Sequence, residues 1–319
     1  MKAILFLGAI ALCGVLEVGS RMSLGLGNPV IFTIDPAFGY LPTANQKTRR
    51  FGSHIQINGA GMRSAEFSVS KSRELHRVLF VGDSVTFGPT FVDQADIFPE
   101  LVPRDLERAG FGRWESLNAS APGWATGNEL GFLKARGTYE ADVVVLVINT
   151  GDLDQAFNLC AGDSCPIRRP ASAIGEALTR YLLPRLGLLE HPKPDSGSTG
   201  ESRDAIPVEQ VIANIDQFRQ IALGGGSDFI LVYLPAKGKA WQAPHWRRQE
   251  SAITQYASEQ HLKFLNLSGA VDSRPLDEVY FDGLHLRPAG HGLVAQALER
   301  YIEADFPSNS VLSANQRAD

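Results

Sequence analysis

The chain has 319 residues, of which 44% are hydrophobic and 20% are charged, a balance that is ordinary for a globular protein. A chain of this length forms one large domain or two small ones and can bury a sizeable core. The net charge of −5 offers no basic surface for nucleic acid, so nucleic-acid binding is excluded as the main function.

The chain begins with a short apolar segment. Lys2 is followed by an uncharged, mostly apolar run from Ala3 to Leu16, and Glu17 ends it. As a helix the run spans about 21 Å at ~1.5 Å per residue, short of the ~30 Å hydrocarbon core of a bilayer. Residues 1–20 are therefore predicted to be a signal peptide or an uncleaved membrane anchor, with a lipoprotein site at Cys13 and a buried helix as further alternatives. A signal peptide, an anchor or a lipoprotein site would each place the rest of the chain in an extracytoplasmic space, periplasmic or secreted.

Strand and helix patterns alternate after an irregular lead-in over 21–75. An insertion at about 153–206 interrupts them; it holds a short helix near 172–183 and a polar, flexible stretch over 192–202. Residues 307–319 are predicted to be a disordered tail. Buried strands are predicted over 78–81, 114–118, 142–148, 228–234 and 262–267, and helices over 96–109, 126–135, 208–223, 247–260 and 289–304. This order predicts one domain over 76–306, a three-layer α/β/α sandwich around a central, mostly parallel five-stranded sheet.

Two cysteines remain after the leader, Cys160 and Cys165. In an oxidising compartment two nearby cysteines in a loop are expected to form a disulfide. A metal site is disfavoured, because no second Cys or His pair has matching spacing.

Two short motifs carry the chemistry. The run ending in Val81-Gly82-Asp83-Ser84 places a serine at the end of a predicted strand, and the C-terminal part of the chain offers Asp282 and His285 in one loop. A serine, an aspartate and a histidine are the parts of a nucleophilic hydrolase. The chain order Ser, Asp, His fits an α/β sheet, in which strand C-termini carry the functional groups.

These motifs resemble those of the SGNH (GDSL) hydrolase family, whose fold is flavodoxin-like. Besides Gly82-Asp83-Ser84 and Asp282-x-x-His285, the stretch Leu117-Asn-Ala-Ser-Ala-Pro-Gly-Trp124 matches the second block of that family. The third block is Gly-x-Asn-Asp in the family, and this chain departs from it: Asn149-Thr-Gly151-Asp152 has glycine where the family has asparagine. The leader and Asn58-Gly-Ala-Gly-Met62 are similar to the membrane-associated, bacterial-type branch.

The resemblance implies roles for these residues. Ser84 would be the nucleophile, His285 its general base, and Asp282 the group that orients the imidazole. The oxyanion hole would use the backbone N–H groups of Ser84 and Gly123. Because Gly151 removes the usual third donor, Asn149 is a candidate substitute.

The resulting prediction is an extracytoplasmic serine esterase that cleaves an acyl or acetyl ester of a small molecule or a glycan, with a glycan as the favoured carrier. No metal or organic cofactor is expected. Trp124, Trp241 and Trp246 are candidates for stacking on sugar rings, although tryptophans also serve as packing. One alternative is an O-acyltransferase that passes the acyl group from the same serine to a polysaccharide. The other is a catalytically degenerate glycan-binding module.

Overall fold

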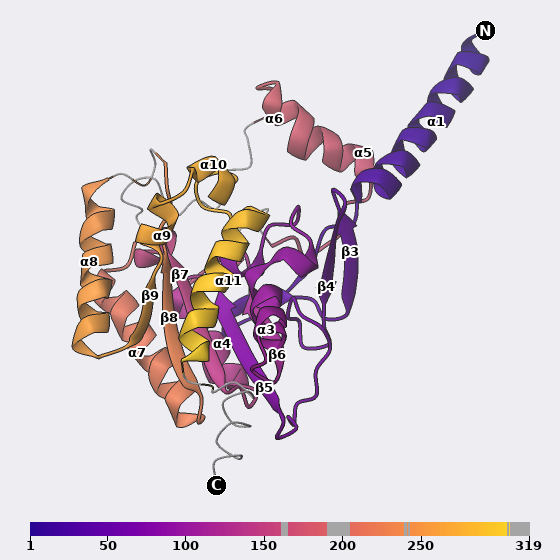
Figure 1. The fold of residues 1–319 in the computed structure, drawn as a ribbon. Coiled ribbons are helices and arrows are strands. Elements are labelled where there is room, and N and C mark those ends of the chain that lie inside the picture. Colours follow the sequence, from indigo (N-terminus) through magenta and orange to yellow (C-terminus); the bar gives the residue numbers. More distant parts are fainter. Residues whose placement is uncertain (161–164, 190–204, 239–240, 242, 305, 307–319) are drawn as a thin grey trace.

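The computed structural model describes residues 1–160, 165–189, 205–238, 241, 243–304 and 306. Its centre is one sheet of five parallel strands in the order β6-β5-β7-β8-β9, which confirms the predicted fold class (Figure 1). The strands are β5 (Leu75–Gly82), β6 (Arg113–Ser120), β7 (Val143–Asn149), β8 (Asp228–Leu234) and β9 (Lys263–Asn266). Every residue of β7 is buried, as expected for the middle strand of a sheet that is covered on both faces.

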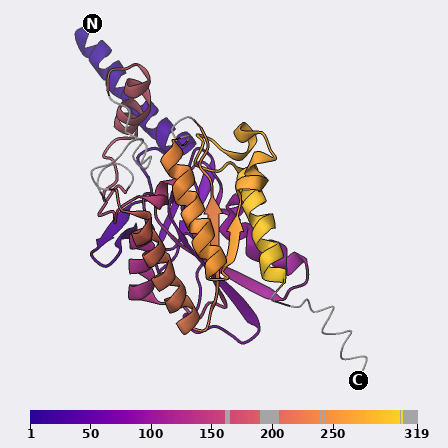
Figure 2. The same cartoon turned by 90° about the vertical axis from the view of Figure 1, so that its left-hand side faces the viewer.

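Helices form a layer on each face of this sheet, seen from two sides in Figures 1 and 2. The helices of the two layers are α3 (Phe98–Arg108), α11 (Pro288–Glu303), α4 (Thr126–Arg136), α7 (Val208–Gly224) and α8 (Pro244–Glu259). Alternate strand residues face different layers. Val78 and Phe80 pack with α3 and α11, whereas Leu79 and Val81 pack with α4, α7 and α8.

Short helical turns lie between the main elements, several of them where a sheet strand ends. They are α2 (Ser84–Phe87), η2 (Gln94–Asp96), η3 (Thr150–Leu153), α9 (Ser268–Asp272) and α10 (Leu276–Val279). Three of them, α2, η3 and α9, follow the carboxyl ends of β5, β7 and β9 directly. This edge of the sheet therefore carries the loops that hold the candidate site.

The segment before the sheet is more regular than its sequence indicated. It contains two antiparallel hairpins, β1 (Phe32–Asp35) with β2 (Gly39–Pro42) and β3 (Gln46–Arg50) with β4 (Ser53–Ile57). In β3 the buried positions are the polar residues Gln46, Thr48 and Arg50. A strand that buries polar side chains shows no hydrophobic alternation, so the pattern could not reveal it.

The N-terminal segment is a helix, α1 (Lys2–Gly19), which continues through a π-helical turn, η1 (Ser20–Leu24). Lys2–Leu24 is long and apolar enough to cross a membrane. None of its most apolar 18-residue window, which has a mean hydropathy of 2.1, is buried against the rest of the protein. This helix projects away from the domain (Figure 1).

The insertion contains one helix in three continuous parts, α5 (Ala173–Glu176), η4 (Ala177–Leu182) and α6 (Leu183–Arg185). Cys160 and Cys165 form the expected disulfide, with Cα atoms 5.8 Å apart. The polar stretch over 192–202 and the predicted tail over 307–319 lie outside the described residues.

Candidate active site

Ser84 is the first residue of α2, directly beyond the end of β5. Asp83 caps this helix, because its Oδ1 accepts a hydrogen bond from the Val85 N–H at 2.9 Å. A Cβ at Gly82 would come within 2.8 Å of the main-chain oxygen of Val147. Glycine is therefore required before the turn that places the serine at the carboxyl edge of the sheet.

The structure brings the three predicted catalytic side chains together. Asp282 and His285 lie in one loop, where Asp282 Oδ1 accepts from the main-chain N–H of His285 at 2.8 Å. The second carboxylate oxygen, Oδ2, lies 2.7 Å from His285 Nδ1. On the other side of the ring, His285 Nε2 lies 3.0 Å from Ser84 Oγ, although the two residues are 201 positions apart in sequence. This is the geometry of a nucleophile, its base and the group that orients the base.

Asp282 keeps its negative charge in this arrangement. Partial burial acts to raise its pKa, but the hydrogen bond and charge of His285 and the two backbone N–H groups of His285 and Leu284 outweigh burial and hold the pKa at about 2. An ionised carboxylate can only accept, so the proton between the two side chains resides on His285 Nδ1. Nε2 is then left as the atom that can take the proton of Ser84.

Two backbone N–H groups are available for an oxyanion, those of Ser84 and Gly123. The register of β5 and β6 sets Gly82 opposite Ser120, so Ser84 and Gly123 lie just beyond two aligned strand ends. Among the described residues neither N–H donates to another protein group. Gly123 has φ of 80°, in the left-handed region that favours glycine.

The turn that carries Gly123 is held by side chains that sequence analysis did not single out. Tyr40 OH donates to the carbonyl of Pro122 at 2.5 Å. The carbonyl of Gly123 accepts from Asn158 Nδ2 at 2.8 Å and from Gln155 Nε2 at 3.1 Å. Because Tyr40 is in the N-terminal hairpin and Asn158 is in the insertion, no local motif could have linked them to this turn.

Asn149, the candidate third donor, lies at the end of β7 with its side chain already in use. Its Nδ2 donates to Asp83 Oδ2 at 2.8 Å, and its Oδ1 accepts from the Gly151 N–H at 2.6 Å. Asp83 Oδ2 is also 3.3 Å from Ser84 Oγ. Asn149 therefore links residue 151 to the carboxylate beside the nucleophile.

Three carboxyl groups are fully buried beneath the site. Burial is the main cause that raises the pKa of Asp83, and it raises the pKa values of Asp152 and Glu129 well above their ordinary values. The charge of Asp83 adds to the shift at both Asp152 and Glu129. Asp83 alone among the three accepts hydrogen bonds from side-chain donors, Asn149 and Ser84. These donors favour its ionised form, so Asp83 is the member of the group best able to hold a negative charge.

The three tryptophans proposed as substrate contacts are placed differently from one another. Trp124 is fully buried and its Nε1–H donates to the carbonyl of Tyr40 at 2.9 Å, so it is a core residue and the stacking role is wrong for it. Trp246 is also buried, at 3% exposure, and packs against Trp241 with ring centroids 5.3 Å apart. Both line a cavity of about 260 Å³ at the end of β8.

An exposed aromatic pair lies beside the catalytic loop. Phe281, next to Asp282, is 55% exposed, and its ring centroid is 4.6 Å from that of Phe91. The Arg287 guanidinium lies 5.3 Å from the Phe281 centroid. The sequence does not reveal this pair, because a single phenylalanine carries no signal of exposure and the contact joins two loops that are distant in sequence.

Comparisons with known proteins agree with this architecture. Residues 80–293 match the model of the GDSL-like lipase/acylhydrolase family. Among solved structures, a lipase/acylhydrolase from Enterococcus faecalis has a TM-score of 0.50 at 17% identity, over 73% of this chain and 98% of that chain. A GDSL-like lipase from Bacteroides thetaiotaomicron has a TM-score of 0.47 at 16% identity, over 75% and 93%.

An acetylxylan esterase from Geobacillus stearothermophilus, solved as a catalytic mutant, has a TM-score of 0.44 at 17% identity, over 71% of this chain and 94% of that chain. The likeness to the Enterococcus faecalis structure, at 17% identity and a TM-score of 0.50, concerns the fold alone. No curated protein matched the sequence. Among the described residues, no group of three or more His, Cys, Asp or Glu side chains could hold a metal ion.

Proposed function

The chain belongs to the GDSL-like lipase/acylhydrolase family and is an ester-hydrolysing enzyme, and from this premise we propose that it is a serine esterase working through an acyl-Ser84 intermediate. The observation that carries the proposal is the continuous chain of contacts from Asp282 through His285 to Ser84 Oγ, at 2.7 and 3.0 Å. These distances are those of a base that is already within reach of its nucleophile.

In the first half of the reaction, Ser84 Oγ attacks the ester carbonyl carbon while His285 Nε2 accepts the hydroxyl proton. The negative charge that develops on the carbonyl oxygen is stabilised by the N–H groups of Ser84 and Gly123. The C–O bond to the alcohol then breaks, and His285 returns the proton to the leaving oxygen. In the second half a water molecule attacks the acyl carbon by the same route and releases the acid.

The substrate we propose is an acyl or acetyl ester carried by a glycan in an extracytoplasmic space. Two features support that location: the apolar N-terminal helix and the disulfide between Cys160 and Cys165. The Phe91–Phe281 pair supports an organic substrate, because it offers an exposed aromatic surface directly beside the catalytic loop.

The test compares the wild type with Ser84→Ala and with Ser251→Ala, a control at an exposed serine of α8. Hydrolysis of p-nitrophenyl acetate should be lost in Ser84→Ala and unchanged in the control. A serine-directed phosphonate should label Ser84, as located by mass mapping. If Ser84→Ala keeps more than about a tenth of the activity, Ser84 is not the nucleophile.

The same experiment separates the alternatives. Labelling of Ser84 without turnover in water, followed by turnover once a polysaccharide acceptor is added, would identify an O-acyltransferase. Absence of both label and turnover in the folded protein would identify a binding module. The intact contacts of Ser84, His285 and Asp282 favour an active enzyme.

A further inference from the structure

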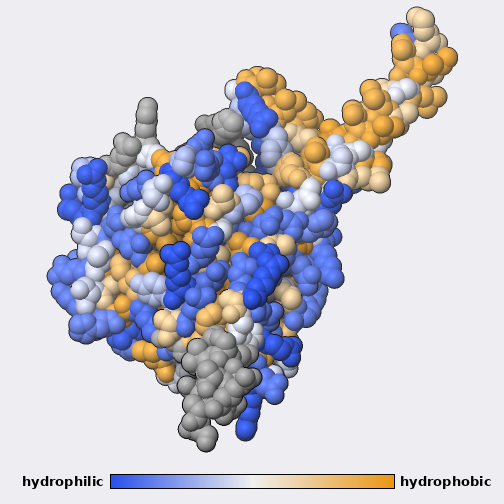
Figure 3. Space-filling model, viewed as in Figure 1, coloured by the Kyte–Doolittle hydropathy of each residue, from blue (hydrophilic) through white to orange (hydrophobic). Residues whose placement is uncertain are grey.

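The helix of the insertion, residues 173–185 (hereafter the inserted helix), exposes its apolar face. Leu178 and Leu182 are 40% and 48% exposed, and Leu186, directly after the helix, is 61% exposed. Their spacing of four residues puts them on one face of a helix. Figure 3 shows hydrophobic side chains over this helix and along α1. A helix on the surface of a soluble domain normally turns such a stripe towards the core.

The inserted helix buries a charged residue instead. Glu176 is almost fully buried and forms an ion pair with Arg50 of β3, with Nη2 and Oε1 2.6 Å apart. Glu176 Oε2 also accepts from the Gly27 N–H, and Arg50 donates to Tyr181 OH at 3.1 Å. Breaking a buried ion pair by rotating the helix would leave unpaired charges in the interior. The leucine face is thus held outward by the fold.

The end of α1 is joined to the start of the inserted helix. The carboxylate of Glu17 accepts from Ser172 Oγ at 2.8 Å and from the N–H groups of Ala173 and Ile174 at 2.8 and 3.0 Å. Arg21 pairs with Glu17 at 2.7 Å and donates to the carbonyl of Ala171. Glu17 thus satisfies N–H groups that the first turn of a helix cannot satisfy itself. Removal of residues 1–20 would remove this cap.

These contacts suit a position at a membrane boundary. The uncharged run from Ala3 to Leu16 spans only about 21 Å as a helix, whereas the hydrocarbon core is ~30 Å thick. In a spanning α1, Glu17 would therefore lie close to the hydrocarbon boundary, where an unpaired carboxylate is costly. Its four donors, including Arg21, offset that cost. Figure 1 shows the inserted helix beginning beside the base of α1 at α5 and extending away from it towards α6, at the end of the domain where the strands of the sheet finish.

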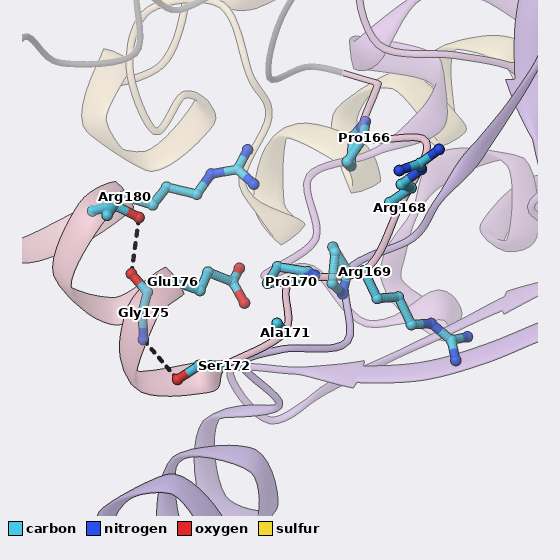
Figure 4. Close-up of a pocket in the computed structure, with 11 residues that line it drawn as sticks. Pro166, Arg168, Arg169, Pro170, Ala171, Ser172, Gly175, Glu176 and Arg180 are labelled. Carbon is cyan, nitrogen blue, oxygen red and sulfur yellow. Dashed lines mark hydrogen bonds between the residues drawn. The ribbon is translucent and has the colours of Figure 1, made fainter.

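A basic cavity of about 670 Å³ lies at the same junction. Figure 4 shows Glu176 and Arg180 of the inserted helix on one side of it and Arg168 and Arg169 on the other. Three arginines next to exposed leucines give the charge pattern of a segment that lies on an anionic bilayer, with basic side chains at the headgroups and apolar ones among the acyl chains.

We propose that α1 is retained as an anchor and that the inserted helix lies in the interface of the same bilayer, with Leu178, Leu182 and Leu186 in its apolar region and the arginine-lined cavity at anionic headgroups. The domain is then held to the membrane at two points, with the carboxyl edge of its sheet on the membrane side. The inference rests on the proposed extracytoplasmic location and not on the ester chemistry.

The first test is the N-terminus of the full-length protein recovered from the membrane fraction of the expressing cells. Intact mass should include residues 1–20, and a mature chain starting near Arg21 would overturn the proposal. The second test uses the full chain in vesicles of phosphatidylcholine and phosphatidylglycerol. Spin labels are placed at Leu182→Cys, at Leu186→Cys and, as a control, at Leu223→Cys, all in a Cys13→Ser background. Leu223, on α7, is as exposed as Leu182, at 48%.

For each label we compare the rate of collision with oxygen to the rate of collision with a water-soluble nickel chelate. The ratio of the first rate to the second should be several-fold higher at positions 182 and 186 than at 223, because oxygen concentrates in the bilayer and the chelate does not. Equal ratios at all three positions would overturn the proposal. Thermal unfolding of each labelled protein reports whether the domain is folded. If the folded wild type hydrolyses no soluble ester, the proposed function is contradicted, but the membrane result is still interpretable.

Discussion

Asn149 and Gly151 are joined by a short hydrogen bond, in which the Gly151 N–H donates to Asn149 Oδ1 at 2.6 Å. The family resemblance sets asparagine at 151 and glycine at 149, so this chain has the two residues exchanged. The exchange leaves a carboxamide in the same neighbourhood but attaches it to the strand end. There it donates to Asp83 Oδ2, whose carboxylate neighbours the nucleophile.

We expect Asn149→Ala to reduce stability more than catalysis. The substitution leaves Asp83 without its amide donor in a buried site, which costs ~1–3 kcal/mol. The kcat per folded molecule should change by less than about ten-fold, because Asp83 and Gly151 already engage the Asn149 side chain; a true oxyanion donor would be worth ~10²–10³. The melting temperature and kcat of Asn149→Ala are compared with those of a control, Asn214→Ala, which also removes a buried asparagine, on α7. A large kcat loss with unchanged melting would identify Asn149 as the third donor.

The exchange at 149 and 151 predicts strong coupling between the two positions. A Cβ at Gly151 would lie 3.0 Å from Asn149 Oδ1 and 3.6 Å from Trp241 Cη2, so Gly151→Asn alone should lower both stability and activity. The double variant Asn149→Gly/Gly151→Asn removes the crowding atom and should recover part of the loss. A double-mutant cycle in kcat/KM and melting temperature measures this coupling. Additive effects would show that the two side chains do not compete for one space.

The rate should rise with pH as the imidazole of His285 loses its proton. The pKa of Asp282 is lowered from 3.8 to about 2, so this carboxylate stays ionised down to strongly acid pH. The stability that Asp282 contributes is therefore present above pH ~4 and lost only as pH falls towards ~2. His285 must be neutral to accept the serine proton. Profiles of kcat/KM for the wild type and Asp282→Asn test this, and a rate that is flat from about pH 5 to 9 would contradict the role of His285.

Glu129→Gln should alter how stability depends on pH. Burial, and then the charge of Asp83, raises the pKa of Glu129 well above its ordinary value. A carboxyl group with a higher pKa when folded binds more protons in the folded state, so the free energy of unfolding falls as pH rises between the two pKa values, by up to ~1.4 kcal/mol per pH unit. Glutamine does not titrate. The melting temperature of Glu129→Gln minus that of wild type should therefore increase from pH 5 to pH 8. The exposed Glu209→Gln is the control, and parallel curves for Glu129→Gln and wild type would refute the assignment.

The sequence by itself determined the elements whose signals are local. The six consecutive apolar residues of β7 before Asn149 predict a buried parallel strand from their own sequence alone. The turn at Gly82 and Ser84 likewise depends only on adjacent residues. Asp282 and His285 are three residues apart, so a single turn is enough to bring their side chains into contact. The five-stranded sheet and the three catalytic candidates therefore follow from the sequence alone.

Only the tertiary structure decided how distant segments meet. The hairpin of Tyr40 fixes the Gly123 turn and buries Trp124, and the contact depends on packing that no local pattern encodes. Glu17 and Ala173 are 156 positions apart, and either residue alone looks like an ordinary helix end. Hydrophobic periodicity shows which face of a segment is apolar, but not whether that face meets the core or lies outside. The inserted helix turns its leucines outward because Arg50, far away in sequence, holds the opposite face inside.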